Sequence, residues 1–526
     1  MKYFEATRVA KPKKNKFDLS HERKLTFNMG NPIPIMCNEV LPGDSFRVQS
    51  SLLVRMLALL APAMHRIDVT VHYFFVPNRL IYKNWQNFIT GGTDGQDISV
   101  APYFTAPIAN GFDTNYLKSS SLLDYLGFPV MKSTDTYNWG ASILRYSALP
   151  LAAYQLIWRE YYRDQTLQPD PFNFTFPMAD ATTSVGTDLF KLRKRCWEKD
   201  YFTSSLPWTQ RGKAVSTPIT ATAVGTAGVF RDATSGTVLT PAANSNVITA
   251  AGTSNISAMQ GVVYQSAIYD PQGSLNITLS ALRLSNRLQQ WLEKNALGGA
   301  RYIEQIAAHF GVISSDARLQ RPEYLGGGKQ TINISEVMQN APISPGSGGY
   351  TPLGTMAGHG ISLGASNQFT RTFEEHSFVL GIMSALPKTA YQNELHPMWN
   401  SRDVNTKYYW PEFANLSEQA VQNQNVYTNM ADAAAQSLAT AVFGYQSRYA
   451  EYKSENDRVS GQFREGLSYW HFGRQFFATP NLNSAFVEAN VRTDPFAVVS
   501  ADNLLAQVYN KIDALRPIPY FGTPRL

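Results

Sequence analysis

The sequence predicts a mainly β protein, an antiparallel β-sandwich whose long loops contain helices. Two adjacent segments, 45–60 and 65–80, alternate apolar and polar residues with the period of a strand. Further strand-like segments follow only at 371–386 and 467–478, and helical patterns lie between and after them. Because strands of one sheet are separated by hundreds of residues, the connections must carry structure of their own.

The first two segments place their apolar residues on one face. In 45–60 the period-two residues are Phe46, Val48, Leu52, Val54, Met56 and Ala58. In 65–80 one face carries Ile67, Val69, Val71, Tyr73 and Phe75, and the other carries Arg66, Asp68, Thr70 and His72. We therefore expect two antiparallel strands, each with one buried face, separated by a turn at Ala61-Pro62.

Three segments have helix signals. Segment 149–165 has Pro150 near its start and an apolar stripe that includes Tyr154 and Trp158. Segment 284–311 predicts two helices, divided at Gly298-Gly299. Segment 502–519 runs from an acidic start to a basic finish, as the helix dipole favours, and is predicted as a helix. Aromatic stripes at helical spacing can serve as nucleotide platforms, but core packing is the commoner role.

Residues 214–280 differ from the rest of the chain in composition. Their only charges are Arg231, Asp232 and Asp270, and Val, Ile, Thr, Ala and Gly alternate along them. This composition predicts small β-hairpins on a projecting loop. The alternative is a flexible spacer, which the high β-branched content disfavours.

The overall composition indicates a protein whose surface is largely covered by neighbours. Only 16% of the 526 residues are charged, whereas 12% are aromatic. Interface cores are depleted in charge and enriched in aromatic residues. A single very large core is the alternative. No secretory signal or membrane-spanning stretch is recognisable, so we expect no membrane insertion.

The net charge of +6 is concentrated at the N-terminus. Residues 1–26 contain eight Lys or Arg against three Asp or Glu, a net of +5, so the remaining 500 residues are almost neutral. Such a block is usually a solvated tail, often one that binds nucleic acid, and a solubilising terminus without a ligand is an equal alternative. The sequence does not decide whether this arm is ordered.

Motifs for catalysis, cofactors and metals are incomplete. The stretch GGGKQ (326–330) resembles a P-loop but has Gln330 where Ser or Thr would bind magnesium. The stretch GHGISLG (358–364) has Leu363 in place of the last glycine of a dinucleotide fingerprint. Glu374 and His376 would share one face of the strand predicted at 371–386, a pair more typical of a surface hydrogen bond than of a catalytic site. We therefore expect no enzymatic activity, no cofactor and no metal site.

Six stretches, in order along the chain, carry a family resemblance. They are FNMGNPIPIMCNEVLPGDSF (27–46), HYFFVPNRLIYKNWQNFITGG (72–92), YQLIWREYYRDQ (154–165), RCWEKDYFTSSLPWTQRG (195–212), RPEYLGGGKQTINISEV (321–337) and ALRPIPYFGTPRL (514–526). The chain resembles the major capsid proteins of microviruses, small icosahedral single-stranded DNA bacteriophages, and specifically those of the gokushovirus branch. The part without a match, 214–270, falls where that branch carries a variable insertion.

The resemblance implies a fold, a domain organisation and an assembly. It implies an eight-stranded antiparallel jelly-roll sandwich with long helix-containing loops, spanning 27–526 after a basic N-terminal arm, 1–26. It implies a T = 1 shell of about 60 identical copies around a circular single-stranded DNA genome. The insertion 214–270 would form a protrusion at the threefold axes that meets the host cell.

Two sets of residues are predicted as sites. The basic residues expected to meet DNA inside the shell are Arg8, Lys11, Lys13, Lys14, Lys16, Arg23 and Lys24. The insertion residues expected at the host contact are Gly225, Arg231, Asp232, Gly236, Asn244 and Asn246.

Further partners follow from charge and from the resemblance. About 60 arms bring roughly 300 positive charges, whereas coding this chain alone takes about 1,600 phosphates. Counterions, polyamines or a small basic DNA-packaging protein must neutralise the remainder, and the resemblance favours including the last. It also implies an internal scaffolding protein, a pilot protein, a host cell-surface receptor, and assembly in the bacterial cytoplasm.

Two other functions stay open from the residues alone. One is a host-surface or glycan-binding β-sandwich that uses 214–270 as its binding module and remains a small oligomer. The other is a β-sandwich hydrolase with carboxylates such as Glu374 and Glu375 in a cleft. Assembly into a large uniform particle distinguishes a capsid protein from both.

Overall fold

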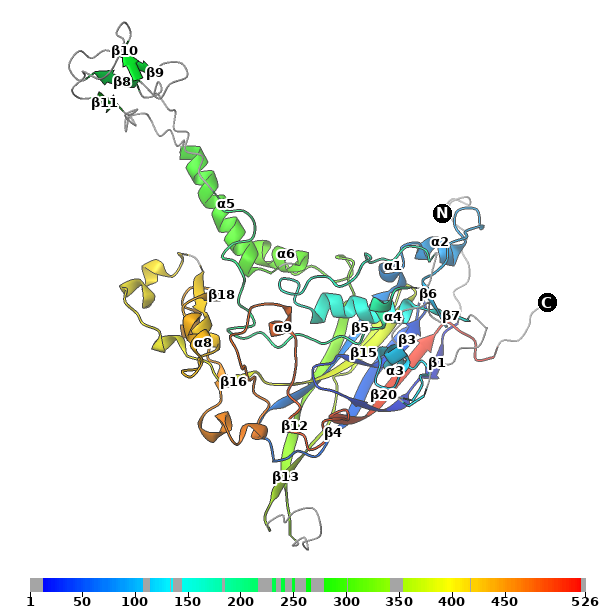
Figure 1. Cartoon of the computed structure of the whole chain (residues 1–526). Helices are drawn as coiled ribbons and strands as arrows, with labels where there is room; N and C mark the ends of the chain where they lie inside the picture. Colours follow the sequence, from blue (N-terminus) through cyan, green and yellow to red (C-terminus); the bar gives the residue numbers. More distant parts are fainter. Residues whose placement is uncertain are drawn as a thin grey trace. The chain divides into compact units, whose positions relative to one another are not determined.

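The computed structural model describes most of the chain in two compact units (Figure 1). One unit consists of residues 1–209 and 297–526, and the other of residues 210–296. The residues described are 13–106, 114–132, 134–135, 144–181, 185–215, 229–232, 238–241, 248–250, 262–265, 279–299, 301–340, 353–416 and 418–521. Within them, no helix is long and apolar enough to cross a membrane.

The larger unit is built on one curled antiparallel sheet of ten strands (Figure 1). Its strands are β1 (Asn15–Asp18), β2 (His21–Phe27), β3 (Ile33–Val40), β4 (Ser45–Met56), β5 (Ile67–Pro77), β12 (Glu323–Met338), β13 (Met356–Ala365), β14 (Phe369–Thr372), β15 (Ser377–Pro387) and β20 (Leu504–Arg516). The order is β1-β20-β4-β13-β12-β5-β15-β3, with β2 also on β20 and β14 also on β4. Strand β12 pairs with β5 through its first part and with β13 through its last, so it joins the two halves of the sheet.

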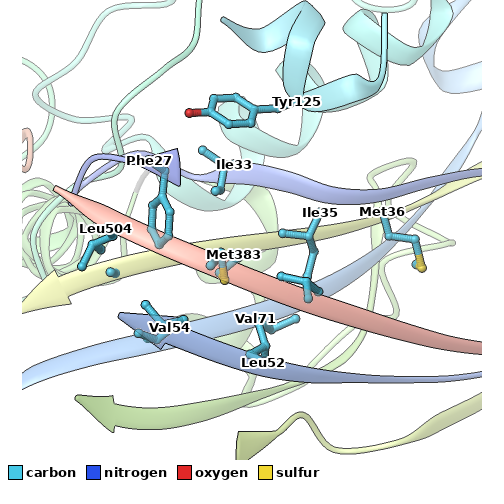
Figure 2. Packing of buried hydrophobic residues seen from close by; sticks show 14 of the residues in the cluster. Phe27, Ile33, Ile35, Met36, Leu52, Val54, Val71, Tyr125, Met383 and Leu504 are labelled. Carbon is cyan, nitrogen blue, oxygen red and sulfur yellow. The ribbon is translucent and has the colours of Figure 1, made fainter. Parts of the chain in front are cut away.

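The main hydrophobic core lies between these two halves (Figure 2). Period-two residues of β4 and β20, among them Leu52, Val54 and Leu504, pack toward residues of β3, β5 and β15 such as Ile35 and Val71. Two sheet halves that close on a shared core form a sandwich. The predicted fold class, an antiparallel β-sandwich with helices in its loops, is confirmed.

A second core covers the outer face of β5 and β15. It contains the helices α1 (Asn78–Ile81), α3 (Leu122–Leu126) and α4 (Leu149–Ile157), the last continuing as a π-helix over Trp158–Tyr162. The prediction that 65–80 buries only one face is therefore wrong. Phe74 and Val76 are buried against the helices, and the buried carboxylate of Asp68 accepts hydrogen bonds from Lys329 (2.8 Å) and Thr331 (2.9 Å).

The helix predicted at 149–165 is confirmed, and its aromatic residues pack as expected. Tyr154 and Trp158 are buried in the second core. The Tyr154 hydroxyl donates to the Pro32 carbonyl (2.9 Å), and the Trp158 indole donates to the Lys194 carbonyl (2.7 Å). These side chains therefore hold the helix to the sheet and are not free for a ligand.

Three further strand and helix predictions need correction. Segments 45–60 and 65–80 form β4 and β5, but β13 and β12 lie between them in the sheet. Segment 467–478 contains a 3₁₀ turn, Ser468–Trp470, and loop, because its aromatic Phe472 enters the core singly rather than at period two. Segment 502–519 forms β20, not a helix: its inward residues alternate from Leu504 to Ala514, and pairing with β4 along its whole length outweighs the helix-like end charges.

The remaining elements of the larger unit are short. The strands are β6 (Tyr103–Ala106), β7 (Leu144–Ser147), β16 (Ala390–Tyr391), β17 (Gln419–Gln422), β18 (Val442–Gln446) and β19 (Asp457–Arg458). The helices are α2 (Trp85–Thr90), α6 (Tyr302–Phe310), α7 (Asn423–Val426), α8 (Ala433–Ser437) and α9 (Ser484–Val487). Helix α6 ends at Gly311 as predicted, with a backbone φ of +69°.

The smaller unit contains four short strands and almost all of the helix α5 (Leu279–Leu297). The strands β8 (Val229–Asp232), β9 (Val238–Pro241), β10 (Ile248–Ala250) and β11 (Val262–Gln265) form an antiparallel sheet in the order β10-β9-β8-β11. The predicted β-hairpins are thus confirmed. The apolar stripe of α5 was expected to pack in a core, but Leu284, Leu288 and Trp291 are exposed in the single chain.

The glycine run of GGGKQ has a structural role in β12. Gly326 sits at a β-bulge with a φ of +131°, which strongly favours glycine. A Cβ atom on Gly327 would lie 2.1 Å from the Val71 carbonyl oxygen of β5, and one on Gly328 would lie 2.8 Å from the Ser366 Cα. The run therefore lets β12 pass closely between its neighbours, which explains the P-loop resemblance without a phosphate.

Gly327→Ala is expected to destabilise the larger unit by about 1–3 kcal/mol, because the β5 backbone has to move to accept the methyl group. Urea denaturation of the unassembled chain measures this loss. Gly466→Ala is the matched control, because a Cβ there meets nothing within 4 Å. Equal midpoints for the two variants would contradict the close packing of β12 on β5.

His72 makes the stability of the fold depend on pH. Burial, with Arg195 nearby, lowers the pKa of His72 to about 4, and its Nδ1 lies 2.8 Å from the Tyr162 hydroxyl. The unfolded chain binds this proton below pH ~6.5, but the folded chain does not until about pH 4. Stability is therefore complete above pH ~6.5 and falls as the pH drops toward 4, by up to about 3 kcal/mol.

Urea midpoints measured from pH 7 to pH 4 test this expectation. His72→Gln removes the titration, so its midpoint should fall less steeply than that of the native chain. Parallel curves for the two proteins would show that His72 does not contribute.

Candidate nucleic-acid interface

Among the described residues, one face of the sheet has no covering layer. Strands β4 and β20 alternate between buried residues, which enter the main core, and exposed or half-buried residues on the opposite face. Strand β2 alternates between half-buried and exposed residues, and only Phe27 at its end is buried. The helices of the second core cover β5 and β15 instead. The uncovered face includes five basic residues, which are Lys16, Lys24, Arg47, Arg55 and Lys511.

Antiparallel register sets the spacing of these cations. Lys24 lies opposite Gln507 of β20, which lies opposite Leu53 of β4. In the next row of this face, Thr26 lies opposite Leu505, which lies opposite Arg55. Residues that face each other on neighbouring strands have their Cβ atoms about 5 Å apart, so each row forms a continuous strip.

The face has a positive balance. On β1, β2, β4 and β20, all fully described, the five cations face three carboxylates, Asp18, Glu22 and Asp513, which gives a net of +2. Lys16 is engaged: its ammonium lies 2.8 Å from Asp513 and lowers the pKa of that carboxyl. None of the other four cations has a carboxylate within salt-bridge distance among the described residues. Four positive charges on this face are therefore available to bind an anion.

The basic residues predicted to meet DNA have different settings in the structure. Arg8 and Lys11 lie outside the described residues. Lys13 and Lys14 precede β1, where the Lys14 ammonium donates to the Gly43 carbonyl. Residues 15–18 and 21–27 of the arm pair with β20 as edge strands, so this part of the arm is ordered on the sheet.

The register of β2 separates two neighbours that the sequence treats alike. Lys24 is exposed on the uncovered face, whereas Arg23 points to the other side of the sheet and is partly buried. Burial lowers the pKa of Arg23. Only Lys24 of this pair therefore lies on the uncovered face with the other cations.

Arg47, Arg55 and Lys511 were missed as candidates. The period-two pattern of 45–60 already places Arg47 and Arg55 opposite the apolar face, so the signal was present. Lys511 was hidden by the helix assigned to 502–519, since a helix gives it different neighbours.

Comparison with known proteins supports the family resemblance over the whole chain. A family model described as "Capsid protein (F protein)" matches residues 7–526. The chain belongs to this family. Its members are structural components of the virion capsid, and this chain is accordingly a capsid protein that assembles with copies of itself.

Curated relatives of this capsid protein come from phages of different hosts. Capsid protein VP1 of Chlamydia phage 1 is 33% identical in an alignment that covers 99% of this chain and 97% of the relative. VP1 of Bdellovibrio phage phiMH2K is 34% identical, with 97% and 95% covered. VP1 of Spiroplasma virus 4 is 27% identical, with 98% and 95% covered. These similarities confirm the predicted relation to gokushovirus capsid proteins.

The carboxylates considered for a hydrolase have a different setting in the capsid protein. Residues 373–376 form a bend between β14 and β15, so Glu374 and His376 do not share a strand face as predicted. Glu375 accepts hydrogen bonds from Nε (2.8 Å) and Nη2 (3.2 Å) of Arg79. Across the described residues, no group of three or more His, Cys, Asp or Glu is placed to hold a metal ion.

Most of the residues predicted for host contact are not among the described residues. Gly225, Gly236, Asn244 and Asn246 are not described, whereas Arg231 and Asp232 are in β8. Backbone pairing places Arg231 opposite Val238 of β9 and Val263 of β11, in the middle of the small sheet.

Proposed function

We propose that this capsid protein forms a closed T = 1 shell of about 60 copies around a circular single-stranded DNA genome, with the uncovered face of β2, β20 and β4 turned inward. The four cations on that face that are not in salt bridges carry the proposal. A Lys or Arg that meets a phosphate releases a counterion whatever the base, so the contact has no sequence preference.

The positive charge of the face is too small to neutralise the genome alone, so other cations must share this role. Together with the basic residues before β1, the face adds a few positive charges per copy, far fewer than the phosphates of a genome that encodes this chain. We include a small basic DNA-packaging protein, counterions and polyamines as further partners, and an internal scaffolding protein and a pilot protein for assembly in the host cytoplasm.

Sedimentation and electron microscopy of the purified protein test the assembly. A large, uniform, closed particle is expected. A glycan-binding β-sandwich would remain a small oligomer under the same conditions, and that result would overturn the proposal.

We propose that residues 214–270 project from the shell and contact the host cell. Their placement in a separate compact unit with its own four-stranded sheet, and their low charge, support this role. Deleting 214–270 is expected to leave closed particles but to reduce attachment to host cells. Particle counts and infectivity measure the two effects, and unchanged infectivity would refute host contact.

A further inference from the structure

A cavity of about 640 Å³ opens where the uncovered face meets the loop before α3. Its walls come from β2, from the ends of β4 and β20, and from residues 119–125. Three basic residues line it, Arg23, Lys24 and Arg55, together with one carboxylate, Asp124. The volume lies within the range of pockets that hold small ligands, and the lining has a net charge of +2.

The positive charges of this cavity lack partners. Among the described residues, no carboxylate lies within salt-bridge distance of Arg23, Lys24 or Arg55. The guanidinium of Arg23 makes one long hydrogen bond, 3.4 Å, to the Pro34 carbonyl. Lys24 and Arg55 are exposed and unpaired on the uncovered face, so this side of the lining attracts an anionic ligand. Asp124 lies beyond salt-bridge distance, but its charge favours the charged form of Arg23, and its carboxylate also accepts the Ser120 backbone N–H (2.9 Å).

The rest of the lining is partly apolar, and it also includes Thr26, Ser119, Ser120 and Gln507. Leu25, Leu53 and Leu505 line it next to the cations, with the ring of Tyr125. The Tyr125 hydroxyl donates to the Thr26 carbonyl (2.7 Å), which holds the ring in place. Leu53 and Leu505, the latter 40% exposed, lie on the uncovered face with Lys24 and Arg55 and suit the flat apolar face of a nucleobase, whereas free phosphate gains nothing from them.

The backbone at the rim is held in an unusual conformation. Ser120 has a φ of +64°, and its hydroxyl donates to Asp502 (2.6 Å), which also accepts from Thr26 (2.6 Å). Residues in such conformations persist where surrounding contacts hold them, and they cluster at binding sites. The loop that closes the cavity is thus tied to β2 and to the chain just before β20.

We propose that this cavity binds one nucleotide of single-stranded DNA, with the phosphate at Lys24 and Arg55 and the base against Leu53 and Leu505, which lie on the same face. This site rests on the proposed function, in which the same face meets the genome. The site would give the DNA one fixed contact in addition to the general electrostatic attraction of the face. Because the lining offers aliphatic contact and charge, binding there is tolerant of base identity.

The test uses the full-length unassembled protein and a fluorescent oligothymidylate. Arg55→Gln is expected to weaken binding about tenfold, since a charge-assisted hydrogen bond is lost. Arg47→Gln is the matched control, because it lies on the same strand and face but outside the cavity, and it should weaken binding about two- to threefold. Oligonucleotides with 4-thiothymidine should cross-link to Leu53 or Leu505.

Other results would contradict the cavity site, the base contact or the proposed function separately. Equal losses for Arg55→Gln and Arg47→Gln, with cross-links spread over the face, would overturn the cavity site and leave the DNA-facing role intact. Competition by inorganic phosphate as effective as that by thymidine monophosphate would overturn the base contact. No binding of the oligonucleotide by the native chain would overturn the proposed function as well.

Discussion

Particles of the variant in which Lys24, Arg47, Arg55 and Lys511 are all replaced by Gln are expected to close but to contain much less DNA. The four side chains are exposed on one sheet face, and none is in a salt bridge within the described residues, so the fold does not depend on their charge. Each of the four substitutions removes one contact with a phosphate. The salt dependence of single-strand binding should fall by about 0.7 per residue, or about 2 to 3 in all.

The ratio of ultraviolet absorbance at 260 and 280 nm and the buoyant density of purified particles measure the packaged DNA. The matched control exchanges each residue for the other basic type, Lys24→Arg, Arg47→Lys, Arg55→Lys and Lys511→Arg, and should package normally. Full-density particles from the Gln variant, with an unchanged salt slope, would show that this face does not meet the genome.

Arg516→Gln is expected to have the largest effect on folding. Asp44 is fully buried, and Arg516 at the end of β20 lies 2.9 Å (Nη2) and 3.0 Å (Nε) from its Oδ2 atom. Arg516 also donates to the Glu39 carbonyl (2.7 Å), so it ties β20 both to β3 and to the turn between β3 and β4. Removing one partner of a buried ion pair leaves an uncompensated charge and costs about 3–5 kcal/mol.

The free energy of unfolding, from urea denaturation of the unassembled chain, measures this cost. Lys407→Gln is the control, because its partner Asp403 is exposed and the pair should contribute less than about 1 kcal/mol. A similar loss for the two variants would mean that the Asp44–Arg516 pair is not a buried anchor of the sheet.

Local patterns predicted the fold where packing and propensity agree. The strands β4 and β5, the helix α4 and the end of α6 at Gly311 follow from alternation, apolar stripes and stop signals. Strand β20 was misread because Asp and Lys near its ends imitate a helix, while its inward residues, from Leu504 to Ala514, follow the period of a strand. Pairing with the partner strand β4 decides between a helix and a strand here.

The candidate site could be predicted in part. Arg47 and Arg55 follow from the alternation of their strand, and Lys24 from the basic segment. The opposite orientations of Arg23 and Lys24 depend on the register of β2 on β20, two segments almost 500 residues apart. The cavity needs the 119–125 loop beside β2, a placement that no local pattern contains.

Electron cryo-microscopy of DNA-filled particles of this chain tests the central claim most directly. The account predicts a shell in which Lys24, Arg47, Arg55 and Lys511 line the inner wall next to nucleic-acid density. A shell in which these four residues face outward, or lie within contacts between neighbouring copies, would contradict it.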